Sequence, residues 1–182
     1  MAILKNVVMI IAITGLLIGV TYWNQLEVAD VQPEPLVPEH LAQWDAKRYQ
    51  GLRDEAGSAV KEDRWADVVQ FCDEMLVWRE DDEVVWFWLG YGHLVQGDYE
   101  QAEQVWNYML RFPRNRRESL YNLACSQAML GKTDEAIGVF GQLLDEGFAD
   151  FEHADEDEHL FPLRGEPRFE RMLDDLSTRV PF

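Results

Sequence analysis

Basic residues are scarce in this sequence. Its 182 residues include 16 Lys and Arg against 34 Asp and Glu, which gives a formal net charge of −18 and an isoelectric point near 4.4. A surface of this sign repels the phosphate backbone of nucleic acids. The one basic cluster, formed by Arg114, Arg116 and Arg117, is too small to overcome that repulsion. Nucleic-acid binding is therefore excluded as an expected function.

Motifs typical of catalysis are also lacking. The sequence has no Gly-rich phosphate-binding loop, no G-x-S-x-G motif and no Ser, His and Asp set in a suggestive context. The four histidines are scattered along the chain: His40, His93, His153 and His159. Carboxylates are so numerous that a pair of them does not mark a site. We therefore expect a protein that is not an enzyme and that binds no cofactor.

Apolar residues, in contrast, are present in sufficient number to form a core. Hydrophobic residues make up 47% of the chain and aromatic residues 12%, a composition that argues against disorder. The length is that of one domain and little more.

One long apolar run stands near the N-terminus. Residues 6–23 contain VVMIIAITGLLIGVTYW, follow Lys5 and carry no charge. A helix of about 18 residues spans roughly 27 Å, close to the hydrocarbon thickness of a bilayer. Tyr22 and Trp23 stand where interfacial aromatic residues are expected. We expect a signal anchor over residues 1–23, with a transmembrane helix at 6–23.

A cleaved signal peptide is the competing interpretation of this run. Cleavage requires small residues one and three places before the cut, and a cut after Ala29 puts Glu27 at the second of those places. The uncleaved anchor is therefore preferred. Because Lys5 precedes the run and the next basic residue is Lys47, the positive-inside rule predicts a cytoplasmic N-terminus and a body on the extracytoplasmic, periplasmic side.

Residues 24–40 have the composition of a linker. They contain Pro33, Pro35 and Pro38, four acidic residues and no Lys or Arg. Proline interrupts helices and sheet ladders, and the like charges repel one another. We expect an extended, acidic spacer between the membrane and the body of the protein.

From about residue 41 the pattern has helical periodicity, and it repeats every 34 residues. The aligned windows are 49–82, 83–116 and 117–150. Their eighth position is small, and their twenty-fourth and twenty-seventh positions are apolar: Ala56, Gly90 and Ala124; Cys72, Trp106 and Phe140; Met75, Met109 and Leu143. Small residues let two antiparallel helices approach closely, while the larger residues fill the space between hairpins. Short turns reverse the chain at Gly97-Asp98-Tyr99 and at Gly131-Lys132-Thr133.

This pattern resembles the tetratricopeptide repeat (TPR) family, whose helical hairpins stack into a superhelix. The second and third windows match well, with WFWLGYGHLVQGDYEQAEQVW and LYNLACSQAMLGKTDEAIGVF. In the first window Glu55 replaces a Leu and Asp63 replaces the turn Gly. The resemblance implies an all-α fold with about three repeats over residues 41–148, preceded by the transmembrane helix.

Residues 149–182 are similar to the closing cap of bacterial TPR groups, through the signature Leu163-Arg164-Gly165-Glu166-Pro167-Arg168-Phe169. Pro167 suits the first turn of a final helix. The predicted apolar face of that helix contains Phe169, Met172, Leu173 and Leu176. We expect it to cover the open end of the stack, which otherwise leaves its core in water.

The resemblance also implies a concave groove lined by the first helix of each hairpin. In the second repeat this face is unusually apolar, and in the third it includes an Asn at a position where some related repeats hold a peptide backbone. The residues predicted to bind a partner are Val84, Phe87, Trp88, Tyr91, Tyr121, Asn122 and Met129. The alternative is that residues 36–48, with Leu36, Leu41 and Trp44, fold into the groove and fill it.

Two further features are interpreted as structural. The acidic run at 145–158 lies near His153 and His159, but its spacing fits neither a calcium loop nor a helical His pair. We interpret it as a solvated acidic face and expect no metal. Cys72 and Cys125 fall two layers apart in a regular stack, roughly 20 Å and beyond disulfide reach, so we expect buried free thiols.

The sequence thus predicts a non-catalytic, membrane-tethered TPR scaffold or assembly factor that binds a protein or peptide in its groove. One alternative is a permanent accessory subunit of a larger membrane complex, with the transmembrane helix packed against other subunits. A third, from a different class, is an enzyme or metal protein built on the acidic cap. The repeat is a generic binding surface, so it does not name the partner.

Overall fold

The structure is a computed structural model, and it describes residues 39–179, with side chains from residue 46 to residue 178. The predicted anchor at 1–23 and all but the end of the predicted linker lie outside the described residues. The chain divides into two units, residues 1–43 and 44–182. The second unit contains the fold described below. None of the helices within residues 39–179 is long and apolar enough to cross a bilayer.

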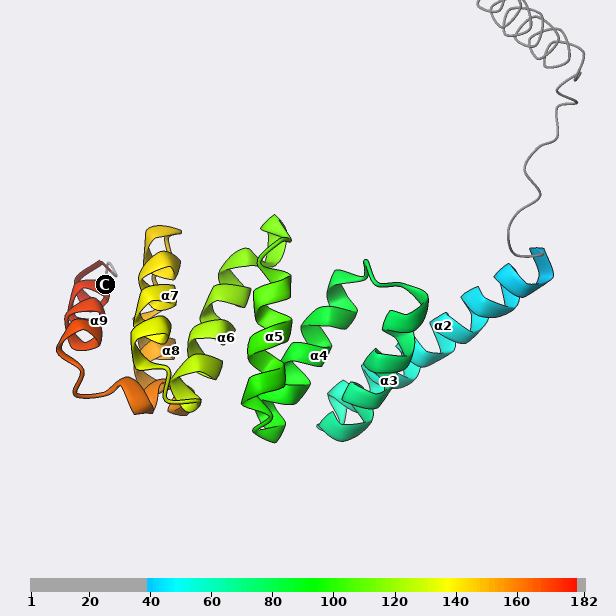
Figure 1. The fold of residues 1–182 in the computed structure, drawn as a ribbon, viewed down its shortest axis with the longest axis horizontal. Coiled ribbons are helices and arrows are strands. Elements are labelled where there is room, and N and C mark those ends of the chain that lie inside the picture. Colours follow the sequence, from blue (N-terminus) through cyan, green and yellow to red (C-terminus); the bar gives the residue numbers. More distant parts are fainter. Residues whose placement is uncertain (1–38, 180–182) are drawn as a thin grey trace, which may run out of the picture. The chain divides into compact units, whose positions relative to one another are not determined.

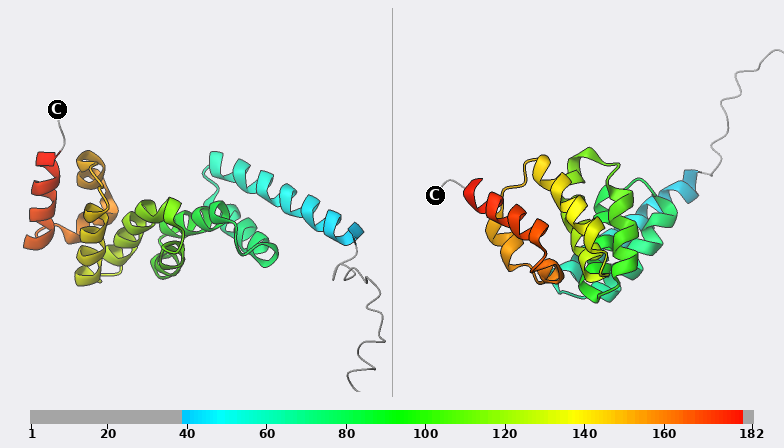
Figure 2. Two further views of the ribbon diagram at one scale, coloured as in Figure 1. Left: turned by 90° about the horizontal axis from the view of Figure 1, so that it is seen from above. Right: turned by 60° about the vertical axis from the view of Figure 1, so that its left-hand side comes forward.

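Residues 39–179 are helical and contain no strand, which confirms the all-helical prediction for this part of the chain. The elements are α2 (Glu39–Lys61), α3 (Trp65–Trp78), α4 (Glu83–Gln96), α5 (Tyr99–Met109), η1 (Pro113–Asn115), α6 (Arg116–Met129), α7 (Thr133–Asp145), α8 (Phe151–Glu156), η2 (Glu158–Leu163) and α9 (Pro167–Arg179). From α3 to α7 each helix packs against the next, and α6 also touches α4 (Figure 1). Figure 2 shows the same succession of these helices from two other sides.

The turn inside each hairpin is the same, and it recurs every 34 residues. Asp63, Gly97 and Gly131 all have positive φ, at 53°, 80° and 71°. The N–H of Gly97 donates to the Leu94 carbonyl at 3.1 Å, and the N–H of Asp98 donates to the His93 carbonyl at 2.9 Å. Asp63 and Gly131 make the equivalent pair of bonds. This Schellman motif satisfies the last carbonyls of a helix. The first hairpin therefore closes in the same way, although its sequence departs from the repeat.

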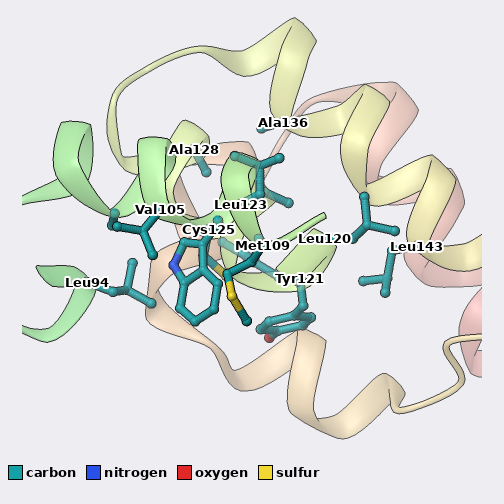
Figure 3. Close-up of a cluster of buried hydrophobic side chains, with 14 of the residues drawn as sticks. Leu94, Val105, Met109, Leu120, Tyr121, Leu123, Cys125, Ala128, Ala136 and Leu143 are labelled. Atoms are coloured by element: carbon teal, nitrogen blue, oxygen red, sulfur yellow. The ribbon is translucent and has the colours of Figure 1, made fainter. Parts of the chain in front are cut away.

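The core is built from the positions that the repeat predicts. The twenty-fourth and twenty-seventh positions of all three windows are fully buried, as are Ala56 and Ala124 at the eighth. Gly90, also at the eighth position, has no room for a side chain, because a Cβ there would lie 2.9 Å from carbons of the Trp106 indole. Figure 3 shows part of this cluster, which includes Val105, Met109, Leu120 and Leu123. The predicted close approach of the paired helices is confirmed.

Both cysteines are buried and free, as predicted. Cys72 lies in α3 and Cys125 in α6. Burial raises the pKa of the Cys72 thiol to about 12, with smaller contributions from the charges of Asp73 and Asp82. Burial likewise raises the pKa of Cys125. These thiols pack as small apolar groups.

Asp82 joins the first hairpin to the second. It precedes α4 and accepts hydrogen bonds from the backbone N–H groups of Val84 and Val85, which caps the helix. Its other oxygen accepts from the Tyr49 hydroxyl at 2.6 Å and pairs with Arg53, both on α2. Burial raises the pKa of Asp82, but the hydrogen bond from Tyr49 and the other favourable contacts outweigh it and lower the pKa overall.

The closing segment, residues 148–179, contains α8, η2 and α9. As predicted, α9 begins at Pro167, and Phe169, Leu173 and Leu176 are buried. The Phe169 ring packs edge-on against Phe140 of α7, with centroids 5.2 Å apart. One contact of the closing segment was not predicted from the sequence. The short helix η2 packs on α6 as well as on α7. It therefore covers part of the inner face of the third repeat.

Candidate functional site

A cavity of about 550 Å³ opens between α4, α6 and the start of the closing segment. Phe87 and Tyr91 line it from α4, and Tyr121 and Asn122 line it from α6. Phe87 and Tyr121 lie 34 residues apart, at the same position of consecutive repeats, so the hairpin stacking places both rings on one face. Phe148, which follows α7, adds a fourth ring. The cavity thus combines four aromatic rings with charged side chains, those of Arg117, Glu118 and Asp150, and we call it the larger cavity.

A second cavity of about 370 Å³ adjoins the first and shares Tyr91, Asn122 and His153 with it. Leu94 and Val95 of α4 line one side of this smaller cavity. The end of α8 and the start of η2 line the other side with Glu156, Asp157, Glu158 and His159. The two cavities together form one groove, which is aromatic in one half and rich in carboxylates in the other.

The structure brings four of the seven predicted binding residues into the groove: Phe87, Tyr91, Tyr121 and Asn122. Val84 is exposed but lines neither cavity, and Met129 is half-buried outside them. Trp88 lies on the side of α4 that faces α2, where the Arg53 guanidinium stands 6.0 Å from its ring centre. The sequence-predicted set is thus divided between the groove and its flanks.

Tyr121 is 7% exposed because the closing segment lies over it. Its ring stacks on His153 of α8, with centroids 4.8 Å apart, and its hydroxyl donates to Asp157 Oδ2 at 2.8 Å. In Figure 3, Tyr121 and Cys125 project from α6 within the buried cluster. Cys125 Sγ lies 3.7 Å from the same carboxylate oxygen. Tyr121 consequently forms a nearly buried wall of the larger cavity.

The interpretation of residues 145–158 as a solvated face is wrong for Asp157. Its side chain is only 14% exposed, and its Oδ1 accepts the backbone N–H of His159 and contacts the His159 ring, both at 2.9 Å. Asp150 caps α8 in a similar way, through the backbone N–H of His153. An Asp just before the start of a helix is a capping signal that can be recognised in a sequence. The hydrogen bond between Asp157 and Tyr121, 36 residues apart, could not be predicted from the sequence.

Electrostatics hold the Asp157 carboxyl group in its charged form. Burial raises the pKa of Asp157, but hydrogen bonds from His159 and Tyr121 outweigh it and hold the pKa well below its usual range. The hydrogen bond to Asp157 raises the pKa of His159 above its ordinary value. Burial raises the pKa of the Tyr121 hydroxyl, so this group stays a donor. The network is a structural clamp between α6 and the closing segment.

Two further predictions concern the filling of the groove by residues 36–48 and the absence of a metal site in the acidic run. Leu36 lies outside the described residues, and the side chains of Leu41 and Trp44 are not described, so filling of the groove by residues 36–48 stays a prediction. Within the described residues, no group of three or more His, Cys, Asp or Glu side chains is arranged to hold a metal ion.

Comparison with known proteins bears on the fold. The tetratricopeptide repeat family matches residues 118–146, a stretch that spans most of α6 and all of α7. No curated protein matches the sequence. The crystal structure of the yeast Tom70 is similar with a TM-score of 0.52 and 20% identity, over 73% of this chain and 24% of that chain. This chain thus spans about a quarter of Tom70, and the likeness is one of fold. The matched repeat and the shared fold together support a helical-hairpin fold of the tetratricopeptide-repeat type.

Proposed function

We propose that this protein is a non-catalytic, membrane-tethered scaffold or assembly factor that holds a protein partner in the groove between α4, α6 and the closing segment. The observation that carries the proposal is the open, aromatic larger cavity, beside which Tyr91 remains 38% exposed. Concave sites with apolar walls and a few polar groups are typical of ligand binding. Val84, Trp88 and Met129 flank this groove in the proposal and widen the contact surface.

Contact in the groove can be tested by cross-linking in native membranes. The variant Phe87→Ala/Tyr91→Ala removes two aromatic walls, so we expect loss of the partner's cross-links with an unchanged helical circular-dichroism spectrum. Phe161→Ala is the matched control, because Phe161 is a 52% exposed aromatic residue of η2 that lines neither cavity. If the double variant retains the same cross-linked partner at the same yield, the groove is not the binding surface.

The membrane tether in this proposal is the apolar run at residues 6–23, and the acidic residues 24–40 are its spacer. Lys5 before the run supports a cytoplasmic N-terminus and a body on the periplasmic side. Deletion of residues 6–23 should release the chain from the membrane fraction into the soluble fraction. Protease added to sealed spheroplasts should digest the body of the undeleted chain. A body that is protected until the cells are lysed would reverse the proposed orientation.

A permanent accessory subunit of a membrane complex is the second candidate. In this candidate function the transmembrane helix itself binds other subunits, whereas in the scaffold it only tethers the protein. Exchange of residues 6–23 for an unrelated transmembrane helix discriminates between the two. A tethered scaffold keeps its partner after the exchange, whereas an accessory subunit loses its complex on a native gel.

The closing segment completes the proposal as the end-of-group cap of the repeats. Its support is the signature at residues 163–169 together with the burial of the α9 residues Phe169, Leu173 and Leu176. A cap gives the last hairpin a covered core face. It also means that the groove has a wall that is not a repeat, which gives this protein a binding surface of its own shape.

A further inference from the structure

The chemistry of the groove walls narrows the kind of partner that fits, and this step rests on the proposed function. The larger cavity is lined by four aromatic rings, those of Phe87, Tyr91, Phe148 and the nearly buried Tyr121. An apolar side chain placed there loses its contact with water and packs against rings on several sides. The first requirement on the partner is therefore one large apolar residue.

The smaller cavity adds a requirement of charge. Glu156 and Glu158 lie on its rim, both exposed, and neither forms an ion pair within the described residues. Asp157 between them is already committed to Tyr121 and His159. No Lys or Arg lines this cavity; its basic side chains are His153 and His159, and the His159 ring is bonded to Asp157. The negative potential of two unpaired carboxylates is thus available to a cation that enters from outside.

The same charges argue against the acidic spacer and a second copy of the chain as occupants, whereas residues 36–48, with two acidic and two basic residues, are left to the test below. Residues 24–40 carry four acidic residues and no Lys or Arg, so that segment would bring like charge to Glu156 and Glu158. A second copy carries a net charge of −18 and is repelled in the same way. Charge complementarity instead favours a foreign, basic segment.

From these walls we infer that the groove binds a peptide segment of a partner protein that carries a large apolar residue and, a few residues away, a Lys or Arg. The apolar residue occupies the larger cavity, and the basic residue lies between Glu156 and Glu158. Asn122, which lines both cavities, stands beside the peptide backbone that links the two.

Defined peptides test this inference on the full chain in a non-ionic detergent, with detergent alone as the blank. The probes are fluorescein-labelled Gly/Ser peptides with one Trp and, about three residues on, one Lys; this spacing is roughly 10 Å in an extended chain. Matched probes carry Glu in place of the Lys, or Ala in place of the Trp. Fluorescence polarisation measures the dissociation constant of each.

We expect the Trp and Lys peptide to bind more tightly than either matched probe. Glu156→Gln/Glu158→Gln should weaken it about fivefold to tenfold, as expected for two partly exposed ion pairs. It should leave the Trp and Glu peptide no weaker. The control Asp174→Asn/Asp175→Asn removes the same charge from exposed positions on α9 and should change nothing.

Three results would overturn the inference, and they bear differently on the proposed function. In the first, the Lys and Glu peptides bind equally well, and both lose binding in Tyr91→Ala. This result would keep the groove as the binding site but remove the requirement for a basic residue. Binding that appears only in the variant Leu36→Ser/Leu41→Ser/Trp44→Ser would assign the groove to residues 36–48. Binding of no peptide would reject this ligand class, and the cross-linking result in native membranes would then decide on the groove by itself.

Discussion

Asp63 occupies a backbone conformation that the equivalent turns give to glycine. Its φ of 53° lies in the left-handed region, as do the φ values of Gly97 and Gly131 at the same turn position. This region costs an L-residue roughly 1–2 kcal/mol, and somewhat less for Asp. Glycine relieves that strain, but it also makes the unfolded chain more flexible, which lowers the stability of the folded state by about 0.4–1 kcal/mol. We therefore predict that Asp63→Gly raises the free energy of unfolding by about 0.5 kcal/mol, measured by urea titration of the helical signal.

Two controls separate conformation from charge at this turn. Asp63→Asn removes the charge and keeps the side chain, so its effect should be smaller than that of glycine. Gly97→Asp introduces the strain at the equivalent turn and should destabilise the protein. A lower urea midpoint for Asp63→Gly than for the natural chain would contradict the prediction.

Gly90 is constrained by the space around it and not by its backbone angles. A Cβ at this position would stand 2.9 Å from two carbons of the Trp106 indole and from Val105 Cγ1. Overpacking of a closed core costs about 1–3 kcal/mol, which exceeds the gain of up to about 1 kcal/mol that Ala brings to a helix. We predict that Gly90→Ala destabilises the protein. The control is Gly138→Ala at an exposed position of α7, where an added Cβ meets nothing within 4 Å. This substitution should stabilise the protein. Equal effects of the two substitutions would refute the packing argument.

At the scale of elements, two carboxylates perform the same task at the two ends of the described stack. Asp82 caps α4 and accepts the Tyr49 hydroxyl from α2, while Asp157 caps η2 and accepts the Tyr121 hydroxyl from α6. In both cases a Tyr on the first helix of a hairpin reaches a cap on a later element. These pairs fix how one hairpin, or the closing segment, docks on its neighbour.

Tyr121→Phe tests the clamp on the closing segment. The substitution keeps the ring and its stacking on His153 but removes one donor to a charged acceptor, so we expect a loss of about 1.5–3 kcal/mol of stability. Hydrogen exchange of residues 151–163 should rise more than that of α4. Tyr91→Phe removes an exposed hydroxyl and serves as the control, with little expected change. Uniform loss of protection along the chain would argue against a local clamp.

The clamp also predicts a dependence on pH. The pKa of His159 is raised in the folded state, so its contribution is complete below about pH 6.5 and is lost as the pH rises through the folded pKa. The pKa of Asp157 is lowered, so its contribution is present above about pH 4 and is lost on further acidification. We predict faster exchange of residues 151–163, corrected for intrinsic rates, at pH 8.5 than at pH 6. His159→Gln should abolish that difference; a difference that persists would place the titration elsewhere.

At the scale of the whole molecule, the net charge of −18 outweighs the local ion pairs. The pairs are mostly exposed, as in Arg48 with Glu74 and Arg168 with Asp134, and such pairs each contribute about 0–1 kcal/mol. General repulsion among the excess carboxylates opposes the compact state. We predict that the thermal midpoint rises as NaCl increases from about 0.01 to about 0.15 M, which shortens the Debye length from about 30 to about 8 Å.

A variant with fewer exposed acids calibrates this salt effect. Glu152→Gln/Asp174→Asn/Asp175→Asn changes the net charge from −18 to −15 without touching an ion pair of the described residues. Its midpoint should respond less to NaCl than that of the natural chain. A midpoint that falls with added salt would show that specific ion pairs dominate over the general repulsion.

By itself, the sequence determined the elements and the core. The 34-residue period was sufficient to place the hairpins, the turns at Gly97 and Gly131 and the buried Trp106 and Phe140, because each depends on a pattern within one or two adjacent helices. The shape of the candidate groove, in contrast, could not be predicted in this way. The wall that Asp157 and His153 build over Tyr121 joins residues more than thirty positions apart, outside the repeat. A periodic pattern specifies which faces pack, but the docking of a non-repeating segment depends on side-chain contacts that only the folded chain brings together.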